Sequence, residues 1–196
     1  MMKTKELILQ NSFALFIEKG YKEVSLNEIL KKCEISKGAF YHHYRSKDEL
    51  YLKVLDRFFF QYFSKQDVDY TDSTLFYKIN YFIGTFLNPY KEIAVILNSN
   101  QVSAYFRFLF QAVNNFPEIR VRVNRHFYTK GYYIYQIIEI AKRNKEVKQS
   151  IDSKITARQI LSTIIGVLIL EGINDIENIE IRFKEIVEEY YKLIKA

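Results

Sequence analysis

Glycine and proline are scarce in this chain of 196 residues, which contains six glycines and two prolines. With so few chain breakers there are few places for tight turns, and this favours long helices over a many-stranded β protein. Hydrophobic residues make up 48% of the chain and charged residues 27%, which suits a soluble protein with a hydrophobic core. The sequence therefore predicts an all-α fold, built as one large domain or as a small domain joined to a larger one.

The single cysteine and the hydropathy pattern bear on where the protein works. Cys33 alone cannot form an intramolecular disulfide or a cysteine-cluster zinc site. Residues 1–6 lead into an amphipathic stretch without a signal-peptide pattern. The most apolar run, residues 160–170, is about half the roughly 20 residues needed to span a bilayer. These features predict a cytoplasmic protein with no membrane partner.

Helix start and stop signals are strong in the first 50 residues. Gly20 is a typical helix stop, and Ser25 with Glu28 forms a capping box for the next helix. Ser36 can cap a short third helix, and a second capping box lies at residues 46–49. Three short helices followed by a long one is the layout of a helix-turn-helix unit and its support. The expected helices are one ending at residue 20, then 26–33, 37–44 and one from 47 onward.

The third expected helix has one face suited to DNA. On a helical projection Phe40 and Tyr44 lie within about 40° of each other and point inward. The residues on the opposite face are small or can donate hydrogen bonds, which suits close approach to a groove. Lys37 and Lys47 each lie at the start of an expected helix, where the lysine and the free backbone N–H groups can together bind a phosphate. The predicted DNA-binding residues are Ser25, Ser36, Lys37, Gly38, Ala39, Tyr41, His42 and Lys47.

Charge alone is weak support for this interface. Residues 31–47 contain five basic residues and one acid, Glu34, which gives a balance of +4. Most such runs are solvated surface in proteins without nucleic-acid partners. His42 and His43 are adjacent and point about 100° apart on a helix, so no metal pair is expected there.

The N-terminal segment resembles the signature of the TetR family of bacterial transcriptional regulators. Residues 20–29 resemble its opening half and residues 35–50 its closing half, and the likeness covers about residues 5 to 55. It implies that Ser25 and Lys47 approach phosphates and that the outer residues of the third helix line the recognition surface. Two departures stand out. The family commonly has Ala-Gly where this chain has Cys33 and Glu34, and Phe where it has Tyr44.

Helical patterning continues to the end of the chain. We expect a DNA-binding domain over residues 1–47 and a larger helical ligand-binding and dimerisation domain over residues 48–196. Pro117 suits the first turn of a long helix. The fourth helix should run on as one stripe to residue 63, and the next should stop at residues 88–89. The other expected segments are a loop at 64–72 and helices at about 90–97, 105–115, 117–145, 153–172 and 176–194.

The last two helices carry an interface signal. Residues 160–170 leave no polar face, so that helix must be covered on both sides, whereas the final helix is apolar on one face only. A single chain could supply the cover. The TetR resemblance instead implies a homodimer built on these two helices, with Gly166 permitting close approach. The predicted interface residues are Leu161, Ile164, Ile165, Leu168, Phe183, Val187 and Tyr190.

Aromatic residues are abundant between residues 50 and 116. Many of them are ordinary core, but the resemblance implies that some line an effector cavity, which would suit apolar or aromatic molecules or cations stacked on rings. Arg107 could instead anchor an acid. The predicted pocket residues are Phe59, Tyr62, Phe63, Phe82, Phe86, Tyr105, Phe106, Arg107 and Phe110.

These features together predict a ligand-responsive repressor that binds a palindromic double-stranded DNA operator as a homodimer and is released by a small apolar or aromatic effector. A helical adaptor without DNA function and a small all-α enzyme are the alternatives. The chain lacks HExxH, GxSxG, a Walker loop and a glycine-rich dinucleotide turn, and it has only three histidines. We therefore expect no enzyme activity, no metal and no cofactor.

Overall fold

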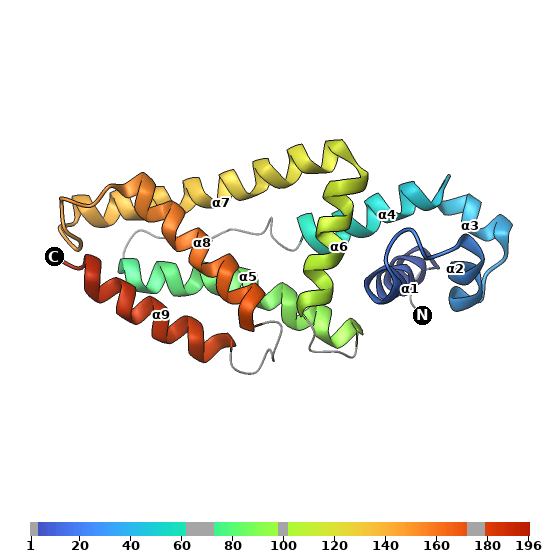
Figure 1. The fold of residues 1–196 in the computed structure, drawn as a ribbon, viewed down its shortest axis with the longest axis horizontal. Helices are drawn as coiled ribbons and strands as arrows, with labels where there is room; N and C mark the ends of the chain where they lie inside the picture. Colours follow the sequence, from blue (N-terminus) through green and yellow to red (C-terminus); the bar gives the residue numbers. More distant parts are fainter. Residues whose placement is uncertain (1–3, 62–72, 98–101, 172–178) are drawn as a thin grey trace.

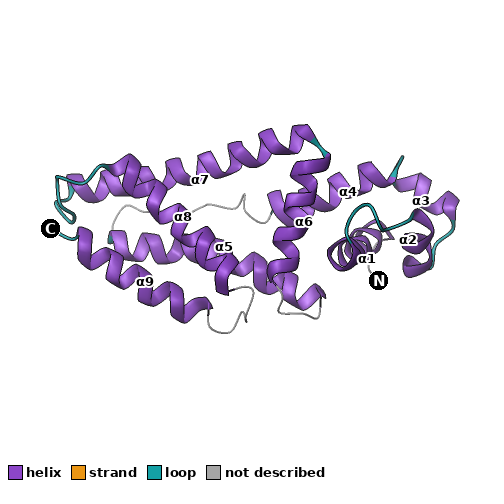
Figure 2. Cartoon of the chain, viewed as in Figure 1, coloured by secondary structure: helices purple, strands orange, loops and turns teal. Residues whose placement is uncertain are grey.

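The computed structural model describes residues 4–61, 73–97, 102–171 and 179–196. These residues form helices joined by short turns, and the only strand-like pairing among them is an isolated bridge between Val147 and Lys195 (Figure 2). The all-α prediction is confirmed.

The N-terminal helices form a compact head at one end of the molecule (Figure 1). A buried cluster that includes Ile8, Phe13 and Ile29 holds them together, and these side chains are fully inaccessible to solvent. Gly20 ends the first helix with a φ of 94°, in the left-handed region that favours glycine. The helices of the head are α1 (Thr4–Lys19), α2 (Leu26–Cys33) and α3 (Lys37–His43).

Helix α4 (Lys47–Leu55) leaves the head and continues directly into η1 (Asp56–Phe60), a single π-helical turn. The N–H of Gln61 donates to the carbonyl of Asp56, five residues back, at 2.9 Å. The predicted stripe is confirmed for its described residues, because Val54, Leu55, Phe58 and Phe59 are all buried, but the π turn itself was not predicted. Phe58 in η1 stacks on Phe13 of the head with ring centroids 4.2 Å apart, so the π turn packs against the core of the head.

The remaining helices form an elongated body (Figure 1). α7 packs along α8, α5 packs on α9, and α6 crosses between the body and the head. Pro117 is the first residue of α7, as predicted, and Asp152 caps α8 by accepting from the N–H groups of Lys154 and Ile155. The body helices are α5 (Leu75–Leu97), α6 (Val102–Asn115), α7 (Pro117–Arg143), α8 (Ser153–Glu171) and α9 (Ile179–Ile194).

Helix α5 differs from the prediction at Pro89. The sequence predicted a stop at residues 88–89 and a new helix after it, but α5 runs without a break to Leu97. Proline lacks the N–H that would bond to the carbonyl four residues earlier, and one missing bond does not end a helix held by tertiary packing. Buried Ile83 and Leu87 on the same helix provide that packing. The predicted loop at 64–72 lies outside the described residues.

Candidate nucleic-acid interface and its coupling to the body

The turn between α2 and α3 is fixed by side-chain caps at both helix starts. Ser25 and Glu28 form the predicted capping box, in which the Glu28 N–H donates to Ser25 Oγ at 3.2 Å and the Ser25 N–H donates to the Glu28 carboxylate at 2.8 Å. Ser36 Oγ accepts from the N–H of Ala39 at 3.1 Å. These bonds satisfy helix N–H groups and set the direction of α3.

Glu34 occupies the left-handed C-cap of α2, with φ 54° and ψ 42°. This conformation favours glycine, because a Cβ crowds the following carbonyl. The position is the one where the TetR signature commonly has glycine, so the departure noted in the sequence has a conformational meaning. The exposed side chain of Glu34 also puts a carboxylate in the turn that leads into α3.

Helix α3 divides into a buried and an exposed face, as predicted. Phe40 is fully buried and Tyr44 is 2% exposed, and the Tyr44 hydroxyl donates to the carbonyl of Lys5. Tyr41 is 48% exposed on the opposite face. Of the other predicted contacts, Ala39 is half-buried, and Ser25, Ser36, Lys37, Gly38 and His42 are exposed. The structure thus brings small and hydrogen-bonding side chains together on one outer surface.

Lys47 has a structural role that the sequence did not reveal. Its ammonium donates to the carbonyls of Tyr21 at 2.9 Å and Val24 at 2.8 Å, and it lies 4.4 Å from the centre of the Tyr21 ring. The Tyr21 hydroxyl in turn donates to the carboxylate of Asp48. Burial, together with this bond, raises the pKa of Tyr21. Lys47 therefore fastens the turn after α1 to the start of α4, and its contact with a DNA phosphate stays a prediction.

Helix α6 is bonded to both the head and α4. The guanidinium of Arg107 donates to the carbonyls of Ile17 and Glu18 at the end of α1. One turn further along α6, Gln111 Oε1 accepts from the N–H of Tyr21 at 3.1 Å. An added Cβ on Gly20 would lie only 2.8 Å from the Gln111 amide, so glycine permits this close approach. Arg107 is thus a link between body and head in this structure.

Two hydroxyl groups connect the same helix to α4 and η1. Tyr51 donates from α4 to the carbonyl of Phe108 at 3.0 Å, and Tyr105 donates from α6 to the carbonyl of Phe58 at 3.0 Å. Both tyrosines are almost completely buried. Because of these bonds, a movement of α6 would also displace α1, α4 and η1.

The predicted pocket aromatics fall into different surroundings. Phe59, Phe82, Tyr105 and Phe106 are buried, whereas Phe110 is 55% exposed. The ring centroids of Phe59 and Tyr105 lie 6.1 Å apart, whereas Phe82 stacks on Tyr133 of α7. Two predicted residues, Tyr62 and Phe63, lie outside the described residues. The backbone of Phe86 belongs to α5, and the placement of its side chain is outside the description too. The pocket assignment stays a prediction.

Three polar residues on the inner face of α7 were not among the predicted site residues: His126, Lys130 and Tyr133. Lys130 is only 2% exposed and lies 5.8 Å from the centre of the Phe82 ring, which stacks on Tyr133 at 5.3 Å. One turn earlier, the ring of His126 packs on Phe59 at 5.4 Å. Burial lowers the pKa of Lys130 to about 8. Burial, followed by the charge of Lys130, lowers the pKa of His126 to about 4.

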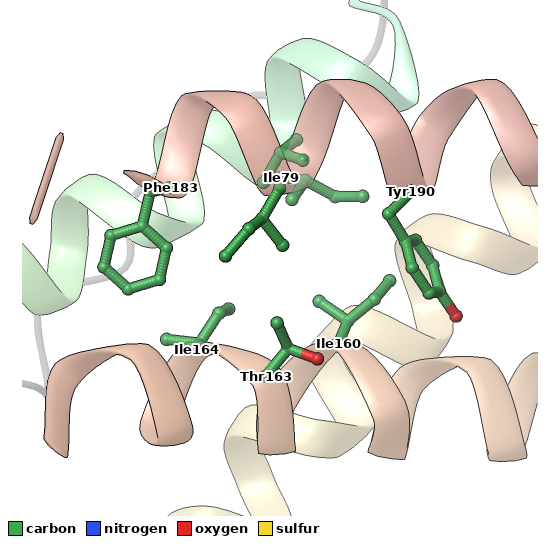
Figure 3. Close-up of a pocket in the computed structure, with 8 residues that line it drawn as sticks. Ile79, Ile160, Thr163, Ile164, Phe183 and Tyr190 are labelled. Carbon is green, nitrogen blue, oxygen red and sulfur yellow. The ribbon is translucent and has the colours of Figure 1, made fainter. Parts of the chain in front are cut away.

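Helices α5, α8 and α9 enclose a narrow apolar hollow (Figure 3). The side chains that border it include several of the predicted dimer contacts, and Figure 3 shows α8 and α9 facing each other across it. The Tyr190 hydroxyl donates to Gln159 Oε1 at 2.9 Å. The lining residues are Ile79, Ile160, Thr163, Ile164, Phe183, Ile186, Val187 and Tyr190.

The predicted dimer residues are largely packed within their own chain. Among them, Ile164, Leu168, Phe183 and Val187 are buried, and Leu161, Ile165 and Tyr190 are half-buried. Helix α8 is nonetheless poorly covered: only 39% of Ser153–Leu170 is buried, although this stretch is long and apolar enough by composition to cross a membrane. Its outward side includes the exposed apolar residues Ile155 and Leu170.

No cluster of three or more histidine, cysteine, aspartate or glutamate side chains that could hold a metal ion occurs in the described ranges. His42 and His43 have ring centroids 5.0 Å apart at the surface, and Cys33 is buried.

Comparison with known proteins gives the same assignment for the head. Residues 8–54 match the family model described as bacterial regulatory proteins, tetR family. The uncharacterised HTH-type regulator YuxN of Bacillus subtilis is 45% identical over 65 residues, which cover 33% of this chain and 22% of YuxN. The biofilm operon negative transcriptional regulator IcaR of Staphylococcus epidermidis is 40% identical over 55 residues, or 28% of this chain and 30% of IcaR. Each match thus spans less than a third of the relative.

Solved structures match over the whole fold. A TetR transcriptional regulator from Chloroflexus aurantiacus superposes with a TM-score of 0.73 at 18% identity, covering 98% of this chain and 96% of the other. A complex of SmeT with triclosan superposes with a TM-score of 0.71 at 17% identity, covering 98% and 92%. At such identities the likeness shows the shared arrangement of helices.

Proposed function

We propose that this chain, whose residues 8–54 match the TetR family of bacterial regulatory proteins, is a transcriptional repressor that binds a palindromic operator as a dimer and is released by a small molecule. The observation that carries this proposal is the outer face of α3, where Tyr41 and His42 are exposed beside small side chains and behind them Phe40 is fully buried. IcaR, a negative transcriptional regulator, supports the repressor role. Such a protein would act in the cytoplasm.

The head has the chemistry that a major groove requires. Gly38 and Ala39 let the backbone of α3 approach base edges, and Tyr41 and His42 supply hydrogen-bonding groups. Helices α2 and α3 start at the exposed residues Ser25 and Ser36, and the N–H groups at the start of a helix bind phosphates favourably. Lys37 adds a positive charge at the start of α3. A helical adaptor without DNA function would have no need of this combination.

A dimer would cover the part of α8 that its own chain leaves open. The outward side of α8 includes Ile155, Gly166 and Leu170, and a Cβ added to Gly166 would meet no atom within 4 Å. A second copy packed there would bury apolar surface, which stabilises association. Two-fold symmetry would then present two copies of α3, which must be about 34–36 Å apart to enter successive major grooves.

The bonds between α6 and the head provide a route by which an effector bound in the body could release DNA. A ligand that shifts α6 or η1 also shifts the head, because Arg107, Gln111 and Tyr105 connect these elements. We propose an apolar or aromatic effector, since Phe59 and Tyr105 are buried beside η1 and since SmeT, a protein of the same fold, forms a complex with triclosan. About 100-fold preference for the non-binding state supplies near 2.7 kcal/mol, enough to vacate a marginally occupied site.

Selection of bound duplexes from a random DNA pool tests the proposal. We expect enriched sequences with two inverted half-sites spaced by one helical turn, and a loss of binding at higher salt. An equivalent selection with the Tyr41→Ala variant should give no enrichment. Binding without sequence preference, equal for both proteins, would contradict the operator-binding role.

The enriched duplex can then be used in a screen for the effector. Lipophilic and aromatic compounds that raise the thermal unfolding midpoint are tested for release of that duplex. Release by a divalent metal ion or a nucleotide, with no release by any stabilising aromatic compound, would contradict this part of the proposal.

A further inference from the structure

The turn from α7 to α8 lies at the end of the body opposite to α3 (Figure 1), and the side chains around this turn line a basic hollow. Its volume is about 660 Å³. Four of its lining side chains are cationic and none is acidic, and with the terminal carboxylate of Ala196 included the local charge is +3. The lining residues are Lys142, Arg143, Lys145, Val147, Lys148, Gln149 and Ala196. We propose that this basic hollow is a binding site for a compact anion that carries consecutive phosphates, separate from the DNA surface of the head.

The backbone around the basic hollow is held from two sides. Lys145 has a φ of 57° after the last turn of α7, and the following N–H of Glu146 donates to the carbonyl of Ala141 at 2.9 Å. The residues after α9 pair with this turn, because the Lys148 N–H donates to the Ile194 carbonyl at 2.9 Å. The cations are therefore attached to a fixed loop.

Two of the lysines are also fixed at their ends. The Lys142 ammonium donates to the carbonyl of Ile151 at 2.9 Å, and the Lys148 ammonium donates to the carbonyl of Leu193 at 2.8 Å. Each ammonium has three donors, so both retain hydrogen-bonding capacity toward an anion. Arg143 is exposed, and neither it nor Lys145 pairs with a carboxylate in the part of the chain that the structure describes.

The nearby acids are engaged elsewhere. Glu146 accepts from the N–H of Leu75 at 2.7 Å and from the Tyr191 hydroxyl at 2.9 Å, so its carboxylate is directed to the start of α5. Asp152 accepts from the N–H groups at the start of α8. Neither carboxylate lines the basic hollow, and the positive charge there is left without an acidic counterpart among the lining side chains.

A compact phosphate chain fits these features better than a duplex does. The cations surround a concave space whose volume lies within the usual range of small-molecule sites. A duplex is bound by cations spread along a stripe that follows its backbone, whereas these four cations lie within residues 142–148 and line one hollow. Arginine binds phosphate oxygens in a bidentate fashion and lysine binds them as a point charge, so both residue types suit consecutive phosphates.

Calorimetric titration of the full chain with inorganic triphosphate, and separately with ATP, tests the site. We expect saturable binding of one anion per chain that weakens as salt rises. The Arg143→Gln/Lys145→Gln double variant should bind about tenfold or more weakly, since two charge-assisted contacts are lost. The charge-preserving pair Arg143→Lys/Lys145→Arg should retain binding. Equal affinity for triphosphate and ATP would assign recognition to the phosphates, and tighter ATP binding would add the nucleoside.

The control removes the same charges elsewhere. Arg120→Gln/Lys184→Gln changes one exposed arginine and one exposed lysine on α7 and α9, and it should leave triphosphate binding unchanged. The proposal is wrong if wild-type protein shows no saturable binding or if the control weakens binding as much as the double variant. A further outcome would also contradict the proposal. If triphosphate does not bind, and adding the double substitution to the Tyr41→Ala variant removes its residual duplex binding, the basic hollow contacts DNA instead.

Discussion

Gln111 of α6 accepts a hydrogen bond from the backbone N–H of Tyr21 at 3.1 Å, and this bond joins the body to the turn that follows α1. The two residues are 90 positions apart in the sequence, and the bond is part-buried. The same turn is held from the other side by Lys47. The orientation of the head is therefore set by contacts from both α6 and α4.

Replacing Gln111 with alanine should loosen this connection. We expect a loss of roughly 0.5–1.5 kcal/mol of unfolding free energy, the usual net value of one hydrogen bond. Amide hydrogen exchange should show faster exchange of the Tyr21 N–H, and release of DNA by an effector should weaken. Gln136→Ala, at an exposed glutamine on α7, is the control. Unchanged exchange at Tyr21 would mean that the bond does not constrain the turn.

Replacing Tyr41 with alanine should abolish or strongly weaken operator binding with little effect on folding. Tyr41 is 48% exposed on α3, so its removal leaves no cavity. Tyr77→Ala, at a 57% exposed tyrosine on α5, should leave operator binding unchanged. Lys37→Ala should reduce the slope of log K against log salt by about 0.9, because one phosphate contact is lost. Operator affinities and salt slopes equal to those of the wild type would show that the recognition surface lies elsewhere.

Lys47→Met should lower both stability and DNA affinity. The substitution removes two bonds from a charged donor, each typically near 1.5–3 kcal/mol, and the half-exposed position reduces that figure toward its lower end. Chemical denaturation and operator titration measure the two effects. Lys53→Met, at an exposed lysine on the same helix, should change stability little. A variant with wild-type stability and lost DNA binding would assign Lys47 to the phosphate alone.

Glu34→Gly should raise stability and DNA affinity together. Glycine adopts the left-handed conformation of residue 34 without the cost of a Cβ, and we expect a gain of roughly 0.5–1 kcal/mol in unfolding free energy. Removal of the carboxylate from the turn also lowers repulsion toward phosphates. Glu34→Gln separates the effects, since it removes the charge and keeps the strain. A destabilised glycine variant would contradict the conformational argument.

Gly166→Leu tests the dimer face without disturbing the fold of one chain. A Cβ at this position meets no atom within 4 Å, and leucine favours a helix over glycine by roughly 0.5–1 kcal/mol. We expect helical content to stay constant while light scattering shows a shift from dimer to monomer. Leu168→Glu is the contrasting variant, because Leu168 is fully buried and its loss should unfold the chain. A wild-type chain that is monomeric at micromolar concentration would remove the proposed interface.

The features predicted correctly from sequence are those that depend on local chemistry. Ser25 with Glu28, Gly20 and Pro117 fix helix ends through their own backbone preferences, so their positions are legible in one sequence. The features that were missed depend on tertiary packing. Pro89 stays inside α5, the helix that carries buried Ile83 and Leu87, and Phe58 of the π turn stacks on Phe13 of the head.

The candidate site shows the same division. The buried and exposed faces of α3 followed from helical periodicity, whereas the contacts of Lys47 and Arg107 join segments far apart in the chain. A signal for His126 and Lys130 was present, because both fall on the apolar stripe of α7 with Val123 and Ile134 at spacings of three and four. A polar residue on such a stripe indicates burial, and burial is what the structure shows for Lys130.

The π turn η1 also limits how this protein could be recombined with its relatives. Each residue added to or removed from a helix rotates everything beyond it by about 100° and shifts it by about 1.5 Å. The number of residues from Ser46 to Phe60 therefore sets how the head is rotated relative to the body. A chimera that joins this body to the head of another family member would present its recognition helix at the right angle only if the number of residues in this connection is kept.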